Sequence, residues 1–150
     1  MINRLKALFA AQEQRRHDHD ELKLAAAALL AEAAHLDGAV DVNERTAIEH
    51  ALARRFGLSQ AEAASLAAEG IAAAERSTQI FGFTRIINDR FDQDERIELF
   101  EMLYEVIYAD DELHAYEDNL MRRLSELIYV PDKERGAARL RVLKRLGRST

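Results

Sequence analysis

The stretch "LKLAAAALLAEAAHLDGAVDVNER", residues 22–45, sets the architecture of the chain. Its apolar residues recur at helical spacing and predict a helix over residues 20–36. Asp37-Gly38 ends that helix, because glycine best tolerates the left-handed backbone at a helix C-terminus. Asp41 stands three residues before Glu44, the spacing of a capping box, and predicts a second helix over residues 43–56. The residues expected to face inward from the first helix are Leu22, Ala26, Leu29, Leu30 and Ala33.

Helical periodicity continues along the rest of the chain, and no segment alternates as a half-buried strand does. Capping-box spacings at Ser59–Glu62 and Asp92–Glu95 mark two further helix starts. The fold class is therefore all-α, a compact bundle of about seven to eight helices. The polar run from Arg15 to Glu21 predicts a linker, which divides the chain into an N-terminal amphipathic segment with its linker (1–20) and a helical domain (21–150). The other expected helices cover residues 2–14, 59–75, part of 77–88, 92–108, 116–129 and 132–146.

Composition restricts the possible classes of protein. The 150 residues include 48% hydrophobic residues, one proline and six glycines, which suits a helical domain with a real core. The absence of cysteine excludes disulfides, thiolate metal sites and cysteine nucleophiles. No apolar run approaches the roughly 20 residues that span a bilayer, and no signal-peptide pattern is present. We therefore expect a cytoplasmic protein.

The charge is divided unevenly along the chain. The net charge is −6, but residues 133–150 hold seven Lys/Arg against one Glu, and residues 1–132 hold 14 basic and 26 acidic side chains. The acidic body argues against nucleic-acid binding. The basic tail is either the polar face of a terminal helix or a contact for an acidic partner.

Two acidic turns resemble each other, "LDGAVDVNE" at residues 36–44 and "ADDELHAYE" at residues 109–117. At an offset of 73, the flanking helices align as well, so the pattern predicts two helix hairpins related by pseudo-twofold symmetry. The aligned identities are Leu30/Leu103, Glu32/Glu105, Asp37/Asp110 and Glu44/Glu117. We expect the two turns to lie close together, with Asp37 and Asp110 within about 20 Å if they share one ion.

The motif "DGAVDVNER" followed by "RRFGLS" resembles the tellurite-resistance protein B (TerB)-like family, whose motif runs Asp-Gly-x-aliphatic-x-x-x-Glu and later Phe/Leu-Gly-Leu-Ser. The segment "YADDELHAYEDNLMRRLSELIYV" resembles the second copy in that family. The resemblance covers residues 22–142 and is nearest to the short, stand-alone bacterial members. It implies an all-helical domain with clustered acidic residues, proposed to bind metal, in stress-associated and tellurite-resistance systems.

Two residues depart from the family pattern. Asp111 replaces the usual glycine of the second turn, and Ala39 stands where many members have a charged residue. The first change puts the shape of that turn in doubt, and the second removes a possible ligand. The family also occurs as a domain of a membrane-associated co-chaperone. The His-Pro-Asp triplet of the J-domain is absent from this sequence, so a co-chaperone activity does not carry over.

Carboxylate oxygens are hard ligands, so a site in these turns would favour Ca²⁺, Mg²⁺ or Mn²⁺, with zinc a weaker candidate. An EF-hand is excluded, because the twelfth residues from Asp37 and Asp110 are Ile48 and Met121. Two other interpretations stay open: the carboxylates are helix caps, or they form an acidic patch for a protein. The candidate metal ligands are Asp37, Glu44, Asp110 and Glu117, followed by Asp41 and Glu112.

The histidines are weaker candidates for metal ligands than the carboxylates. His17 and His19 can share a metal only on extended or loop backbone, while His35 and His114 flank the acidic turns and could add to a zinc site. The sequence has no Gly-x-Ser-x-Gly elbow, no glycine-rich phosphate loop and no His-Glu-x-x-His. We therefore expect a protein that is not an enzyme and that has no organic cofactor.

The expected helix over residues 2–14 carries an apolar stripe of Ile2, Leu5, Leu8 and Phe9. A helix this short is marginal alone in water, so the stripe is expected to dock. Its own body, a partner or neighbouring subunit, and an anionic membrane surface are the three options. Docking on protein is favoured, because only Arg4 and Lys6 flank the stripe before the polar run. The protein partner itself stays unknown.

Overall fold

The computed structural model describes residues 2–34, 40–76, 81–110 and 115–148; the side chains of residues 2, 12–19, 81, 110 and 115–117 fall outside this description. Over these residues the chain is all-α, as the sequence predicts, with seven α-helices and one short 3-10 helix. The helices are α1 (Ile2–Ala34), α2 (Val42–Phe56), α3 (Gln60–Arg76), α4 (Phe81–Arg90), α5 (Gln93–Ile107), η2 (Tyr108–Asp110), α6 (Ala115–Leu127) and α7 (Asp132–Arg145).

The predicted linker at residues 15–21 is wrong as secondary structure. One continuous helix of 33 residues runs from Ile2 to Ala34 and includes the whole polar run. The physical reason is that residues 2–34 hold no glycine or proline, so nothing interrupts the helix. Polar side chains alone do not end a helix; they only disfavour the burial of that part of the helix in the core. The division of the chain into two units at residue 20 stays a prediction.

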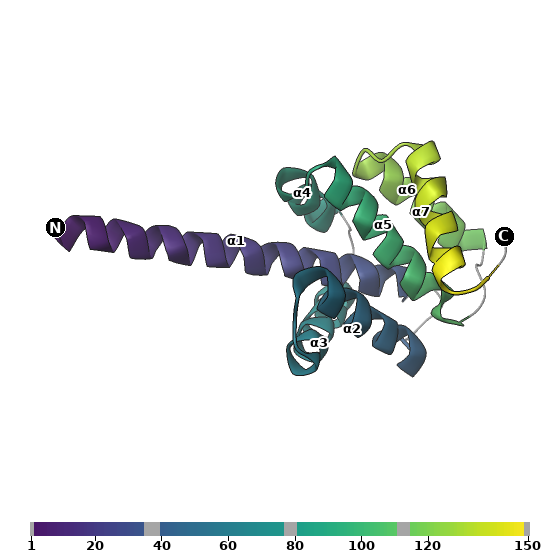
Figure 1. The fold of residues 1–150 in the computed structure, drawn as a ribbon, viewed down its shortest axis with the longest axis horizontal. Helices are drawn as coiled ribbons and strands as arrows, with labels where there is room; N and C mark the ends of the chain where they lie inside the picture. The colour runs from purple at the N-terminus through teal and green to yellow at the C-terminus, as the bar shows by residue number, and fades with distance from the viewer. Residues whose placement is uncertain (1, 35–39, 77–80, 111–114, 149–150) are drawn as a thin grey trace.

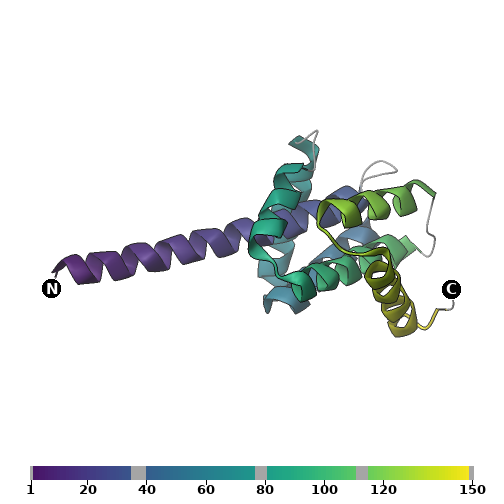
Figure 2. The same ribbon diagram turned by 90° about the horizontal axis from the view of Figure 1, so that it is seen from above.

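Helix α1 has two unlike halves (Figure 1). Its N-terminal half projects away from the rest of the molecule, and the view turned by 90° shows the same (Figure 2). Its C-terminal half lies inside the bundle, where α2, α3, α4 and α5 all pack against it. Nearly every residue from Ala25 to Ala34 is at most 2% exposed; only Glu32 is partly exposed. The sequence predicted one inward face, but helices on all sides bury the other faces too.

The alanines of this buried half let neighbouring helices come close. Gly70 of α3 faces Ala27 of α1 with no room between them. A Cβ added at Gly70 would lie 2.5 Å from the Ala27 Cβ and 2.7 Å from its carbonyl carbon. Because backbone atoms cannot move aside as a side chain tip can, residue 70 has to be glycine for α1 and α3 to pack this way.

The helices after α3 form the other side of the bundle. α5 lies against α1, α2 and α7, and its apolar side chains fill the centre. The C-terminus of α6 is held by side chains of α4 and α5, since Asn88 donates to the Leu127 carbonyl at 2.8 Å and Arg96 to the Ile128 carbonyl at 3.2 Å. These bonds satisfy carbonyls that a helix end leaves without intrahelical donors. The duplication of the two hairpins stays a prediction.

All three predicted capping boxes are confirmed. At Ser59, Asp41 and Asp92, the side chain accepts from the backbone N–H three residues on, and the glutamate there accepts from the cap's own N–H. Hydrogen bonds from Ser59 lower the pKa of Glu62. Gly57 ends α2 in the left-handed conformation, with φ of 64°. Local sequence therefore fixes where α2, α3 and α5 begin.

Gly70→Ala should destabilise the fold by about 1–3 kcal/mol, because the added methyl group forces α1 and α3 apart. Gly136→Ala is the matched control: Gly136 is also helical, but nothing lies within 4 Å of an added Cβ. That change should stabilise the fold by about 0.5–1 kcal/mol through helix propensity alone. Urea denaturation of the three proteins measures both effects. Equal effects of the two substitutions would contradict the close α1–α3 contact.

Candidate functional site

The six predicted metal ligands are described to different degrees. Asp37 and Glu112 lie outside the described residues, and so does the predicted separation of Asp37 from Asp110. Asp110 ends η2 and Glu117 lies in the first turn of α6, but only their backbone is described. Asp41 and Glu44 are the two whose side chains are described. They belong to the first turn of α2.

Asp41 and Glu44 cap α2. Asp41 Oδ1 accepts from the Glu44 N–H at 2.7 Å, and Glu44 Oε1 accepts from the Asp41 N–H at 3.1 Å. Glu44 is only 5% exposed, whereas Asp41 is exposed. The capping interpretation is thus confirmed for this pair. Each capping bond occupies one oxygen of its carboxylate, and the box holds both carboxylates in a fixed direction.

Asp41→Ala should lower the free energy of unfolding by about 1 kcal/mol, because the Glu44 N–H at the start of α2 loses its acceptor. Asp41→Asn should change it by only a few tenths of a kcal/mol, since asparagine caps as well as aspartate does. Thermal and urea unfolding of both variants in metal-free buffer provide the measurement. An asparagine variant as unstable as the alanine variant would show that the charge of Asp41, rather than its cap, stabilises the fold.

The start of the second acidic turn lies against α2. The 3-10 helix η2, which ends at Asp110, packs on α2, the helix that begins in the first acidic turn. Tyr108 and Ala109 of η2 line one wall of a pocket of about 360 Å³, and Ala47 and His50 of α2 line another. The described residues that lead into the second acidic turn, those of η2, therefore pack beside α2, which follows the first acidic turn.

Helix α7 and the segment that follows it also hold η2, through Tyr108. Arg139 Nε donates to the Tyr108 hydroxyl at 2.7 Å, and Arg148 donates to the Tyr108 carbonyl at 2.7 Å. The Arg139 guanidinium also lies 5.9 Å from the Tyr108 ring centroid, and the Tyr104 ring stacks on the Tyr108 ring with 6.2 Å between the centroids. Burial raises the pKa of Tyr104 to about 12, so it stays neutral at physiological pH. These contacts fix Tyr108, the residue directly before the second acidic turn.

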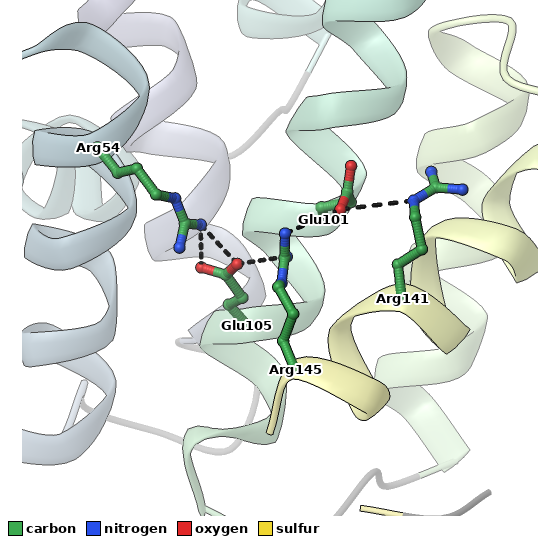
Figure 3. Close-up of polar contacts among 5 residues, drawn as sticks. All are labelled: Arg54, Glu101, Glu105, Arg141 and Arg145. Carbon is green, nitrogen blue, oxygen red and sulfur yellow. Dashed lines mark hydrogen bonds and ion pairs between the residues drawn. The ribbon is translucent and has the colours of Figure 1, made fainter. Parts of the chain in front are cut away.

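An ion-pair network joins α2, α5 and α7 beside this pocket (Figure 3). Glu105 of α5 is its centre: Arg54 Nη2 of α2 lies 2.5 and 2.6 Å from its two oxygens, and Arg145 Nη2 of α7 lies 2.6 Å from one of them. Arg145 Nη1 also pairs with Glu101 at 3.1 Å, and Arg141 Nε lies 3.6 Å from the same carboxylate. Part of the basic tail thus meets carboxylates of its own chain.

Sequence reasoning missed this network, although a signal for it exists. Arg141 and Arg145 stand four residues apart on one helix, and Glu101 and Glu105 stand four residues apart on another. Residues at this spacing share a helix face, so two such pairs of opposite charge can meet when their helices pack. That signal needs the packing of α5 against α7, which the sequence alone did not provide.

Glu105→Gln should destabilise the fold by about 1–2 kcal/mol at low salt, because Arg54 and Arg145 both lose their shared carboxylate. The arginines are 59% and 47% exposed, so solvent limits the effect, and salt should reduce it further. Glu98→Gln, a carboxylate of α5 that is 54% exposed, is the control and should cost less. Urea unfolding at two salt concentrations measures both. A loss independent of salt and equal in the two variants would contradict a central role for Glu105.

The histidine pair His17–His19 lies in α1. Positions i and i+2 lie about 200° apart around a helix, whereas the shared metal required extended or loop backbone at these residues. His35 and His114 lie outside the described residues. His50, which the sequence analysis did not select, is exposed and lines the pocket between α2 and η2.

The described part of the chain contains no group of three or more His, Asp or Glu side chains placed to hold a metal ion. A site in the acidic turns would therefore need the carboxylates that fall outside the description, as well as Asp41. Within the same described ranges, no helix is both long and apolar enough to cross a membrane.

Over the residues that the structure describes, the chain is an all-helical bundle in which α2 begins after Asp41 and η2 ends at Asp110. The family model described as "Tellurite resistance protein TerB" matches residues 23–140, which is most of the chain. The chain therefore belongs to the TerB family, and the resemblance seen in its motifs is confirmed. Searches of curated proteins and of solved structures give no match.

Proposed function

We propose that this TerB-family chain is a non-enzymatic helical module that binds a divalent cation through its acidic turns. The observation that carries the proposal is the packing of η2, which ends at Asp110, against α2, which begins with Asp41 and Glu44. Carboxylates from sequence positions far apart thereby come to neighbouring elements. Their hard oxygens suit Ca²⁺, Mg²⁺ or Mn²⁺ better than softer metals.

The residues present suit such an ion in part. The capping box holds the Asp41 carboxylate in place while leaving the residue exposed, so an ion can approach it. Glu44 is buried and serves first as a cap, which makes it a weaker ligand than Asp41. Asp37, Asp110, Glu112 and Glu117 would supply the remaining oxygens. The bound ion would offset the negative charge of the carboxylates that hold it.

The proposed biological setting rests only on the name of the family. The family name refers to tellurite resistance, so we place the module in a bacterial stress or tellurite-resistance pathway in the cytoplasm, where it would pass a cation-dependent change to an unidentified protein partner. No catalytic role is part of the proposal, because neither the motifs nor the described side chains favour one.

Thermal melts with and without millimolar Ca²⁺, Mg²⁺, Mn²⁺ and Zn²⁺ test the proposal. A cation at 100 times its dissociation constant adds roughly 2.7 kcal/mol, which should raise the Tm by roughly 5–10 °C in a chain of this size. Asp37→Asn with Asp110→Asn should abolish the rise. Asp92→Asn is the control, because it neutralises an exposed aspartate that belongs to neither turn.

The second candidate is a protein-interaction or scaffold domain whose acidic turns are only helix caps. The Asp41–Glu44 capping box favours it, since that box accounts for two of the six carboxylates without any ion. A Tm unchanged by all four cations would support this candidate and contradict the first. A rise that survives in the Asp37/Asp110 double variant would place the ion elsewhere.

A further inference from the structure

The projecting half of α1 carries an apolar surface that its own body does not cover. Leu5 is 56% exposed, and Leu8 and Phe9 are each 62% exposed. Every described side chain from Asn3 to Ala11 is exposed, so this segment contacts no other helix of the body there. Figure 1 shows the N-terminal half of α1 extending beyond all other helices. Docking on the chain's own body, the first option that the sequence left open, is therefore wrong.

The three apolar side chains share one stripe of the helix, and cations border it. Residues next to each other on a helix point about 100° apart, so Arg4 and Lys6 lie on opposite sides of Leu5. Both cations are exposed. Residues 1–12 contain no Asp or Glu at all. A stripe of large apolar residues edged by Lys and Arg is the pattern of a helix that lies in a membrane interface, where long cations reach the headgroups.

The continuity of α1 strengthens the positive charge of this segment. The polar run that was expected to be a linker is helical, so Arg15 and Arg16 continue the same helix. Residues 1–16 hold four Lys/Arg and one Glu, a local charge of +3 in a chain whose net charge is −6. The charge of residues 1–16 therefore complements anionic lipids at the projecting end of α1.

A second copy of the chain fits the stripe less well. A stable interface buries about 800 Å² on each partner, which is more than three side chains and their neighbours provide. A coiled coil would need apolar residues to recur every seven positions, but the positions seven and fourteen after Phe9 hold Arg16 and Lys23. Two copies paired through this face would bring like charges together after the third turn.

We infer that the N-terminal turns of α1 bind the surface of an anionic lipid bilayer, with Leu5, Leu8 and Phe9 among the acyl chains and Arg4 and Lys6 at the phosphates. The helix lies on the bilayer and does not cross it. Binding is reversible, since a few apolar side chains and cations anchor it. This inference is independent of the proposed cation site.

Cosedimentation of the full chain with vesicles tests the inference. The chain should bind vesicles of phosphatidylcholine mixed with phosphatidylglycerol, bind phosphatidylcholine alone more weakly, and lose binding as salt increases. The triple variant Leu5→Gln, Leu8→Gln, Phe9→Gln should lower the partition coefficient by about tenfold or more. Ala7→Gln with Ala10→Gln, two exposed residues on the other face, is the matched control and should bind as the unchanged chain does.

Circular dichroism and sedimentation velocity complete the test. All variants should remain folded, because every changed residue is exposed. Absence of binding by the unchanged chain to anionic vesicles would overturn the inference, as would equal binding by the triple and control variants. A dimer in solution that the triple variant converts to a monomer, without vesicle binding, would assign the stripe to a second copy of the chain.

Discussion

The close packing of α3 on the alanine-rich half of α1 is the contact on which the rest of the bundle depends. Ala25 to Ala34 are buried from several directions at once, because small side chains let helices approach on every side. Gly70 meets Ala27 at a distance that excludes even one methyl group. Since α2, α4 and α5 also pack on this half of α1, a shift of α3 would disturb the helix that all of them share.

Charge organises the surface where α2, α5 and α7 meet. α5 presents Glu101 and Glu105 between Arg54 of α2 and the arginines of α7 (Figure 3). Exposed ion pairs contribute little individually, but several charges that share one carboxylate act as a network. Arg139 of α7 and Arg148, which follows that helix, both contact Tyr108 of η2. The basic tail thus positions the residue before the second acidic turn.

How far the sequence predicts this structure depends on the range of each interaction. The caps at Asp41, Ser59 and Asp92 were predictable, because a capping box involves residues only three apart. The break at residues 15–21 was predicted wrongly, because a polar run was taken for a helix stop although no glycine or proline supports one. The Gly70–Ala27 contact joins residues 43 positions apart, and no local pattern specifies such a crossing.

The candidate sites also differ in how far the local sequence predicts them. The sequence placed Asp41 and Glu44 at the start of α2, yet it could not distinguish a cap from a ligand, since both uses need a carboxylate at that spacing. The apolar stripe of Leu5, Leu8 and Phe9 was also visible in the sequence. What the stripe faces was not, because that depends on whether the following residues bend back toward the body or continue as a helix.

Helix α1 therefore connects two regions of unlike stability. Its C-terminal half is fixed by the core, and this half provides the nucleus from which the projecting turns can extend. A helix of 33 residues is about 50 Å long, so the stripe near its start is remote from the first acidic turn that follows Ala34. The described side chains from Asn3 to Ala11 are all exposed, so the helical state of these turns has no support from burial and is sensitive to its surroundings. Any surface that covers the stripe therefore stabilises those turns directly, while the core holds the C-terminal half of α1 in place.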